Sequence, residues 1–312
     1  MNASWRKRLI KNPVVDGLAH PSTRFNARRL ARRVRGKRVL ITGASYGIGE
    51  ATARLLAAAG ARVVLVARTE ERLREVAEAI RSRGGWARRY TADVTDTAEV
   101  EQLLAAIEAD EGGIDIFVNN AGKSIRRSFA RSRHRDYERT MAVNYLGPVK
   151  LLLGVVPGMR ERRSGQVINI STVGVGFPPA ARWGAYQASK SAFDTLFRSI
   201  GLEVRHDGVQ FSSIYLPLVY TRMSAPTPQL REGMAPGMTA DEAAAQVARA
   251  IIQRKRVIAP WWFYPTEVAV LLLRPSIAGI LSFWFAHTED TRSARLSSAD
   301  TTSSGEHTHD QQ

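Results

Sequence analysis

From Arg38 onward, short apolar runs alternate with segments of helical periodicity, and few folds accept such a pattern. Buried strands are predicted at the apolar runs Val39–Ile41, Val63–Val66, Ile114–Val118, Val167–Ile170 and Phe211–Tyr215. Helices are predicted between them, among others at Ala51–Ala59, Glu70–Ile80 and Ala98–Ile107. Strands that alternate with helices form right-handed βαβ units, in which helices cover both faces of a parallel sheet. We therefore expect an α/β fold with a doubly wound parallel sheet, the Rossmann fold.

The alternation of strands and helices continues toward the end of the chain, and its extent indicates the limits of one domain. Thr239 and Glu242 have the spacing of a capping box, which predicts a helix over Asp241–Gln253, and Val257–Ala259 is predicted as a further strand. At roughly 150 residues per domain, 312 residues allow two domains, or one large α/β domain with appendages. Because the alternation covers residues 36–259 without a second pattern, we expect a single domain there.

The first predicted strand leads directly into a glycine-rich turn and then into a helix. Three glycines permit a tight turn, a close approach of the backbone to a pyrophosphate and close packing of helix on strand, while the helix N-terminus offers N–H donors to phosphate. A dinucleotide site is therefore predicted at Gly43, Ser45, Tyr46, Gly47, Ile48 and Gly49.

The end of the second strand indicates which dinucleotide is bound. A carboxylate is expected there when the ribose 2′-hydroxyl of NAD is the ligand, but Arg68 occupies that place. A guanidinium group suits a 2′-phosphate, so the sequence favours NADP(H). Further cofactor contacts are predicted where the third and fourth strands end, from Asp93, Val94, Asn120, Ala121 and Gly122.

Four polar residues form the candidate chemical site. Tyr186 and Lys190 stand four residues apart and so share one face of the helix that runs on to Glu203. Ser171 ends the fifth strand, and Asn144 lies in the helix before that strand. Since a parallel sheet gathers such residues at its carboxyl edge, we expect all four beside the nicotinamide.

Together these motifs resemble those of the short-chain dehydrogenase/reductase family over roughly Gly36 to Ala259. The matching elements are the glycine turn, Asn119-Asn120-Ala121-Gly122, Asn144, Ser171 and Tyr186-x-x-x-Lys190. The resemblance implies that Tyr186 is the general acid in carbonyl reduction and the base in alcohol oxidation, and that Lys190 holds the nicotinamide ribose. It further implies that Ser171 hydrogen-bonds the substrate carbonyl and that Asn144 anchors a water leading to Lys190. Relatives usually pair the helices of Asn144 and Tyr186 between subunits, so a homodimer or homotetramer is expected.

The general acid has to exchange a proton near neutrality. A free phenol has a pKa of about 10, so useful exchange needs that pKa lowered by about 3 units. An ammonium group about 4 Å away supplies a shift of this size at an effective dielectric constant near 20. We therefore expect Lys190 to lower the pKa of Tyr186.

A more specific resemblance, to one group within the family, rests on three segments: residues 120–128, 138–145 and 217–227. They are similar to the reductase domains of actinobacterial fatty acyl-CoA reductases, and by resemblance Pro217, Val219 and Thr221 contact the cofactor. The similarity implies a lipid carbonyl as substrate: a fatty aldehyde, an acyl thioester or a long-chain ketone. Two alternatives stay open, a steroid or other secondary-alcohol dehydrogenase of the same family and a non-catalytic NADP-binding scaffold or sensor.

Basic residues are concentrated at the amino end of a chain whose formal charge is +16. Between Met1 and Arg38 there are twelve basic residues and one acid. Such charge suggests a nucleic-acid or anionic-membrane partner. Because the charge lies mainly in the first 38 residues, the rest of the protein need not bind a polyanion. We therefore expect no nucleic acid as partner. Residues 1–35 are predicted as a basic arm whose stripe of Ala27, Leu30, Ala31 and Val34 indicates a short helix. We expect this helix to be a solvated lead-in, with contact to a membrane surface as the alternative.

Residues 260–286 are apolar and aromatic, but Glu267, Arg274 and prolines interrupt them, and no stretch approaches the ~20 residues of a membrane span. An apolar lid or membrane-interfacial segment is predicted, with ordinary core as the alternative, and then a disordered polar tail over residues 287–312. Arg126, Arg127 and Arg131 either meet the phosphates of a thioester carrier or form solvated surface.

The absence of cysteine excludes disulfides, thiolate metal sites and cysteine nucleophiles, and is consistent with a reducing compartment. The six histidines show no paired ligand spacing, so no metal is predicted. We expect a cytoplasmic protein, with peripheral contact to the inner face of the membrane left open.

Overall fold

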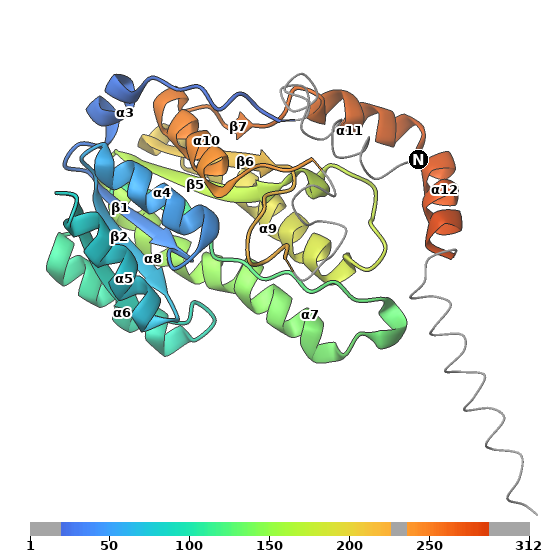
Figure 1. Ribbon diagram of the computed structural model, residues 1–312, viewed down its shortest axis with the longest axis horizontal. Coiled ribbons are helices and arrows are strands. Elements are labelled where there is room, and N and C mark those ends of the chain that lie inside the picture. The colour runs from blue at the N-terminus through green and yellow to red at the C-terminus, as the bar shows by residue number, and fades with distance from the viewer. Residues whose placement is uncertain (1–19, 226–235, 287–312) are drawn as a thin grey trace, which may run out of the picture.

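The computed structural model describes residues 20–225 and 236–286, which form a seven-stranded parallel sheet (Figure 1). The strand order is β3-β2-β1-β4-β5-β6-β7, so the chain reverses its direction of winding between β1 and β4. The strands are β1 (Arg38–Thr42), β2 (Arg62–Ala67), β3 (Trp86–Thr91), β4 (Ile116–Asn119), β5 (Gly165–Thr172), β6 (Val209–Leu216) and β7 (Val257–Ile258). The prediction of a doubly wound α/β fold is confirmed, and the carboxyl edge beside the reversal is where such sheets bind ligands.

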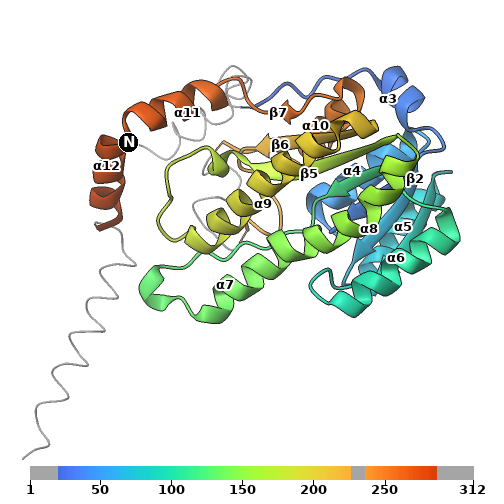
Figure 2. The same cartoon turned by 180° about the vertical axis from the view of Figure 1, so that it is seen from behind.

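Helices cover both faces of the sheet, as two views from opposite sides show (Figures 1 and 2). One face is covered by α4 (Gly47–Ala58), α5 (Glu70–Arg81) and α10 (Ala240–Gln253). The other is covered by α6 (Thr97–Glu111), α8 (Gly147–Glu161) and α9 (Gly184–Glu203). Each face buries its own apolar cluster, because Ile168 and Ile170 of β5 point to one side and Val167 to the other. The predicted capping box begins α10, with the Thr239 N–H donating to Glu242 at 2.7 Å.

The helix predicted near the amino end is present as α3 (Ala27–Val34), but it is not a solvated lead-in. Leu30 and Val34 are buried in the cluster that α10 also joins. The stretch before the helix is fixed too, because Gln246 of α10 donates to the carbonyl of Ser22 at 3.1 Å. The apolar stripe is thus used within the protein. Residues 1–19, the outer part of the predicted arm, and the tail 287–312 lie outside the described residues.

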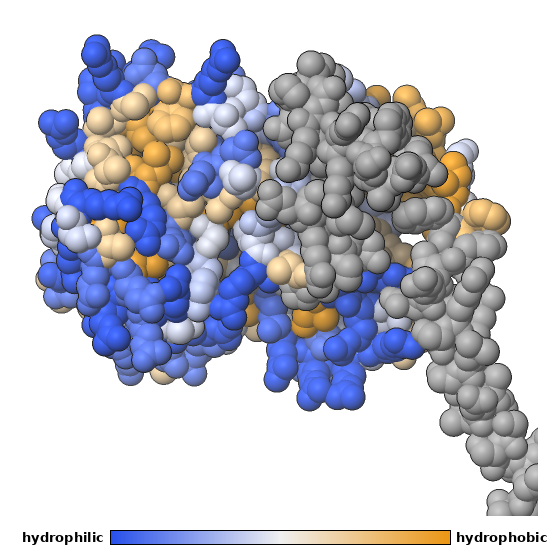
Figure 3. All heavy atoms as spheres, viewed as in Figure 1, coloured by the Kyte–Doolittle hydropathy of each residue, from blue (hydrophilic) through white to orange (hydrophobic). Residues whose placement is uncertain are grey.

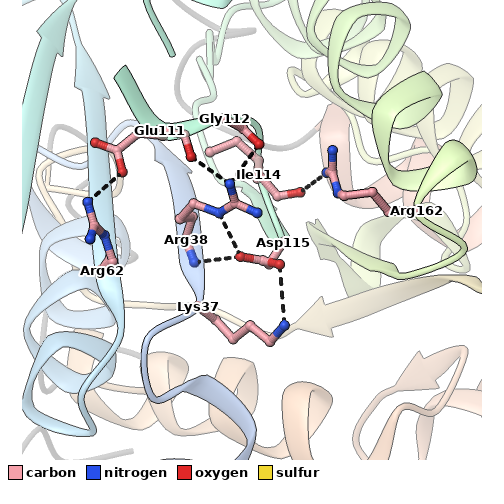
Figure 4. Close-up of polar contacts among 8 residues, drawn as sticks. All are labelled: Lys37, Arg38, Arg62, Glu111, Gly112, Ile114, Asp115 and Arg162. Atoms are coloured by element: carbon pink, nitrogen blue, oxygen red, sulfur yellow. Dashed lines mark hydrogen bonds and ion pairs between the residues drawn. The ribbon is translucent and has the colours of Figure 1, made fainter. Parts of the chain in front are cut away.

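Charged side chains join the strands at the amino edge, opposite the candidate site (Figure 4). Arg38 donates to Asp115 at 2.9 Å and to the carbonyls of Glu111 and Gly112 at 2.5 and 2.6 Å. The wholly buried Glu111 side chain pairs with Arg62 at 3.0 Å. A buried carboxylate is stable only with such partners, so these contacts hold the end of α6 against the starts of β1, β2 and β4.

The apolar segment that follows β7 forms two helices, α11 (Phe263–Leu272) and α12 (Arg274–Ala286), bent against each other by 96°. Within the described residues, one helix is long and apolar enough to cross a membrane, His134–Glu161, and the bent pair of α11 and α12 meets the same criterion when its two helices are taken together. The single helix consists of α7 (His134–Met141), a π-helical turn (Ala142–Leu146) and α8. Because α8 packs Leu151, Val155 and Met159 against the sheet, its apolar character is explained by the core.

Candidate active site

The glycine turn between β1 and α4 has the shape that the sequence predicts. Gly43 and Gly47 have φ values of +65° and +56°, a region that favours glycine. A Cβ atom at Gly49 would lie 2.2 Å from the Gly43 carbonyl oxygen, so only glycine fits there. The Asn120 amide closes the turn by donating to the carbonyls of Thr42 and Gly43 at 2.9 and 3.2 Å.

The same turn has the features required for a dinucleotide pyrophosphate. No side chain caps the N-terminus of α4, where Tyr46 is the N-cap residue, so the first N–H groups of a twelve-residue helix point toward the carboxyl edge. Ser45 is buried within the turn, and Ile48 follows in the first helical turn. The residues present therefore fit a bound phosphate, which the glycines, Ser45 and the helix end would hold.

Arg68 and Asp93, predicted from separate strands, lie together at this edge. The Arg68 guanidinium is 3.4 Å from the Asp93 carboxylate and is 67% exposed. Burial disfavours the charged form of Asp93, but hydrogen bonds from Thr95 and the charge of Arg68 outweigh it and lower the pKa of that carboxyl. Val94 next to it is buried in the core. Arg68 is thus available at the surface, beside a residue predicted to meet the adenosine.

The loop after β6 folds back over the glycine turn. The Thr221 methyl group lies so close to Gly47 that a Cβ atom there would be 3.1 Å away. Val219 is buried, two residues beyond Pro217, and forms a bridge with Met238. Arg222 stacks on the Tyr46 ring at 4.4 Å, which the sequence reasoning did not anticipate. The structure therefore brings Thr221 to the glycine turn, while the cofactor contacts of Pro217, Val219 and Thr221 stay predictions.

Asn144 lies in the π-helical turn between α7 and α8 and is buried. Its side chain accepts from the Lys123 N–H at 2.8 Å and donates to the Lys123 carbonyl at 2.9 Å. It also donates to the Ser189 hydroxyl, which in turn donates to the Tyr186 carbonyl at 2.8 Å. Asn144 thus ties the loop after Ala121 and Gly122 to the helix of Tyr186, while its predicted contact with a water stays a prediction.

The hydroxyl beside Tyr186 is that of Thr172. The Tyr186 phenol is hydrogen-bonded to the Thr172 side chain. Ser171, predicted for this role, is buried, and its Oγ has no hydrogen-bond partner among the described residues. Neighbouring residues of a strand point to opposite faces, so only one of two adjacent hydroxyls can face the phenol. The sequence signal for Thr172 is its place at the end of β5, directly after Ser171.

The pKa values of Tyr186 and Lys190 differ from the expected ones. The Lys190 ammonium donates to the Ile170 carbonyl at 3.0 Å, and burial lowers the pKa of Lys190 to about 8, although Asp194 favours its charged form. Burial raises the pKa of Tyr186 to about 12, against the effect of the Thr172 hydrogen bond. The expectation that Lys190 lowers the pKa of Tyr186 is therefore wrong for this structure, because desolvation of the phenolate dominates. At neutral pH Tyr186 holds its proton and can donate it.

A cavity of about 530 Å³ lies between the loop after β4, the loop after β5 and the helices α11 and α12. Its wall is mostly apolar and includes Ile125, Phe129, Phe177, Ile277, Leu281 and Phe285. Gly184 and Ala185 line it as well, so it reaches the residues that directly precede Tyr186, although Tyr186 itself is not in the wall. Its volume is in the range of small-molecule sites, roughly 300–1,000 Å³.

A doubly wound parallel sheet with a glycine turn after β1 and a Tyr–Lys pair on α9 defines a nucleotide-dependent oxidoreductase. The family model described as short chain dehydrogenase matches residues 37–232. The chain belongs to this family and is an NAD(P)-dependent oxidoreductase.

Two relatives and one solved structure are similar to the chain. An uncharacterized oxidoreductase of Mycobacterium bovis is 47% identical over 234 residues, covering 73% of this chain and 68% of the relative. A fatty acyl-CoA reductase of Acinetobacter baylyi is 46% identical over 228 residues, covering 72% of this chain and 76% of the relative. The crystal structure of a metagenomic short-chain oxidoreductase in complex with NADP is 30% identical, with a TM-score of 0.63, and covers 73% of this chain and 99% of that one.

Proposed function

We propose that this protein is an NADPH-dependent reductase of a hydrophobic carbonyl compound, a fatty acyl thioester, a fatty aldehyde or a long-chain ketone. The observation that carries the proposal is the apolar cavity of about 530 Å³ that reaches the start of α9. Its walls hold far more apolar than polar side chains, so it suits an alkyl chain better than a sugar or a small polar alcohol. The similarity to a fatty acyl-CoA reductase supports the same substrate class.

The preference for NADPH rests on the residue at the end of β2. Arg68 follows Ala67, the last residue of that strand, where a carboxylate would accept the 2′-hydroxyl of NAD. Its guanidinium group is exposed and can form two hydrogen bonds to a 2′-phosphate. The NADP bound in the metagenomic relative supports this choice.

The site residues have complementary roles in the proposed reduction of an aldehyde or a ketone. When bound, the nicotinamide supplies a hydride to the carbonyl carbon. Tyr186 donates its phenolic proton to the carbonyl oxygen, which completes the alcohol, and Thr172 donates a hydrogen bond to the same oxygen as negative charge develops there. Lys190 would hold the nicotinamide ribose, with its ammonium group anchored on the Ile170 carbonyl.

The test is oxidation of NADPH by the purified full chain with fatty aldehydes, acyl-CoA thioesters, 3-oxoacyl thioesters and sterols. We expect turnover with one or more of the acyl substrates and not with sterols. Tyr186→Phe should bind NADPH with unchanged affinity and lose turnover, because the substitution removes only the proton that is transferred. Turnover of sterols alone would instead assign a steroid dehydrogenase, and retention of most of the activity by Tyr186→Phe would contradict the role of this residue.

A further inference from the structure

Most of the exposed large hydrophobic side chains among the described residues lie within 261–283, on and beside α11 and α12. They include Val268, Leu271, Leu272, Leu273, Ile280 and Phe283, and the leucines 271 and 272 are 72% and 74% exposed. Apolar side chains gather over α11 and α12 at the upper right of the molecule (Figure 3). Contiguous apolar surface of this kind marks an interaction site in a soluble protein.

The opposite side of the same two helices is held by the protein. Phe263 of α11 is buried and stacks on Tyr215 of β6 with 4.7 Å between ring centroids. Ile277, Leu281 and Phe285 of α12 line the cavity, and the Arg182 guanidinium lies over the Phe285 ring at 5.4 Å. The outward-facing leucines are therefore not needed for the contacts that hold α11 and α12 on the protein.

A basic rim borders this apolar surface. Across the cavity from α12 runs the segment 123–139, which contains seven lysine and arginine residues and two acids. One of the acids, Asp136, is buried and pairs with Arg127, whereas Arg133 and Arg135 are exposed. Phe129, 87% exposed, projects from the same segment. Arginine next to exposed aliphatic and aromatic side chains is the composition of segments that lie at an anionic bilayer interface.

We propose that α11, α12 and the basic rim form a docking surface for an anionic lipid bilayer. The two helices have 10 and 13 residues, so each alone is shorter than the about 20 residues of a span. Together they are long and apolar enough for a broken span, but the bend of 96° and the packing of Phe263 and Phe285 on the protein favour a position along the interface. A second copy of the chain fits this surface less well, because it presents the same arginine-rich surface and no complementary negative charge, whereas an anionic headgroup layer supplies that charge.

The placement also gives the bilayer a route to the cavity, a consequence that rests on the proposed function. Leu281 and Phe285 of α12 and Phe129 of the basic segment line the cavity from opposite sides. An alkyl chain that leaves the leaflet between α12 and residues 125–132 would enter the cavity without crossing water.

The test is flotation of the full-length protein with vesicles of phosphatidylcholine, with and without phosphatidylglycerol. We expect binding that is strongest with phosphatidylglycerol. Leu272→Glu should lower the ratio of bound to free protein by about tenfold or more, because one leucine no longer leaves water and a charge must enter the interface. The matched control is Leu202→Glu, an exposed leucine of α9, which should bind as the unchanged protein does.

The rim is tested by charge reversal. Arg133→Glu with Arg135→Glu should lower binding to anionic vesicles by about tenfold, and Arg28→Glu with Arg32→Glu on α3 serves as the matched control. Unchanged binding of Leu272→Glu, with binding lost on reversal of Arg6, Lys7 and Arg8, would assign the contact to the amino end and overturn the proposal. A change of oligomeric state in Leu272→Glu, with no vesicle binding by the unchanged protein, would make the surface an interface between copies and overturn it as well.

These results can be separated from a failure of the proposed function. Leu272→Glu should reduce a short, water-soluble aldehyde at the rate of the unchanged protein, because Leu272 lies outside the cavity wall. Vesicle binding by an enzyme that reduces no acyl substrate would refute the proposed function and leave the docking surface standing.

Discussion

The phenol of Tyr215 donates a hydrogen bond to the Asp194 carboxylate, with 2.9 Å between the oxygen atoms. Asp194 is buried on α9, one helical turn after Lys190, and Arg198 lies one turn further with 3.1 Å between its Nε and the same carboxylate. Ser213 faces the carboxylate from β6. Because the Asp194 charge raises the pKa of Lys190 against the effect of burial, this network keeps a buried lysine charged beside the site.

Asp194→Asn should move the pH dependence of turnover. Without the carboxylate, the pKa of Lys190 falls below its value of about 8, so the ammonium is lost at a lower pH. A rate that needs this charge is complete below the pKa of Lys190 and declines as the pH rises through it, and in the variant the decline should begin at lower pH. The measurement is a profile of kcat against pH.

The control for this profile is Arg198→Ala, which removes an exposed partner of Asp194 and leaves the carboxylate in place. Its profile should move much less. A uniform loss of rate in Asp194→Asn at every pH would show that the residue matters for packing rather than for the charge of Lys190.

Thr172→Val should lower kcat by a factor on the order of 10² to 10³, the usual loss when one donor to a developing oxyanion is removed. Thr172→Ser should restore most of the rate, since it keeps the hydroxyl. Ser171→Ala should change kcat little and leave stability equal or higher, because the Ser171 hydroxyl is buried without a partner among the described residues. Steady-state kinetics and urea denaturation of the three variants show which of the two hydroxyls acts in the reaction. A larger loss of kcat in Ser171→Ala than in Thr172→Val would assign the hydrogen bond to the substrate oxygen to Ser171.

Arg68→Asp should weaken NADPH binding by about tenfold to a hundredfold, as expected for the loss of a hydrogen-bonded charge on a phosphate, and should improve the use of NADH. Fluorescence titration with both nucleotides measures the change. Arg74→Asp, which makes the same charge change at an exposed position of α5, is the control. Equal affinity for NADPH in the two variants would remove Arg68 from the cofactor site.

Leu30→Ala should destabilise the protein by about 2–5 kcal/mol, the cost of a cavity at a fully buried leucine. The measurement is the free energy of unfolding from urea denaturation. Arg28→Ala, at an exposed position of the same helix, should stay within about 0.5 kcal/mol of the unchanged protein. If the two variants were equally stable, α3 would not be part of the folded domain.

The parallel sheet, the glycine turn and the Tyr–Lys pair could be predicted because each depends on neighbours in the sequence. Apolar runs of strand length alternate with helical periods, three glycines lie within seven residues, and Tyr186 and Lys190 are one helical turn apart. The turn could be placed at the cofactor because a strand precedes it and a helix follows it.

Contacts between distant segments were decided by the tertiary structure alone. Thr172 rather than Ser171 faces Tyr186 because the direction of each side chain depends on how β5 sits beside α9. The pKa of Tyr186 depends on its burial, and that of Lys190 on its burial and on Asp194. The spacing of residues in the sequence reveals neither effect. The stripe of α3 turned out to be core because α10, more than two hundred residues later in the chain, covers it. A sequence displays which residues can be buried or charged, whereas desolvation and packing depend on the segments that meet in space.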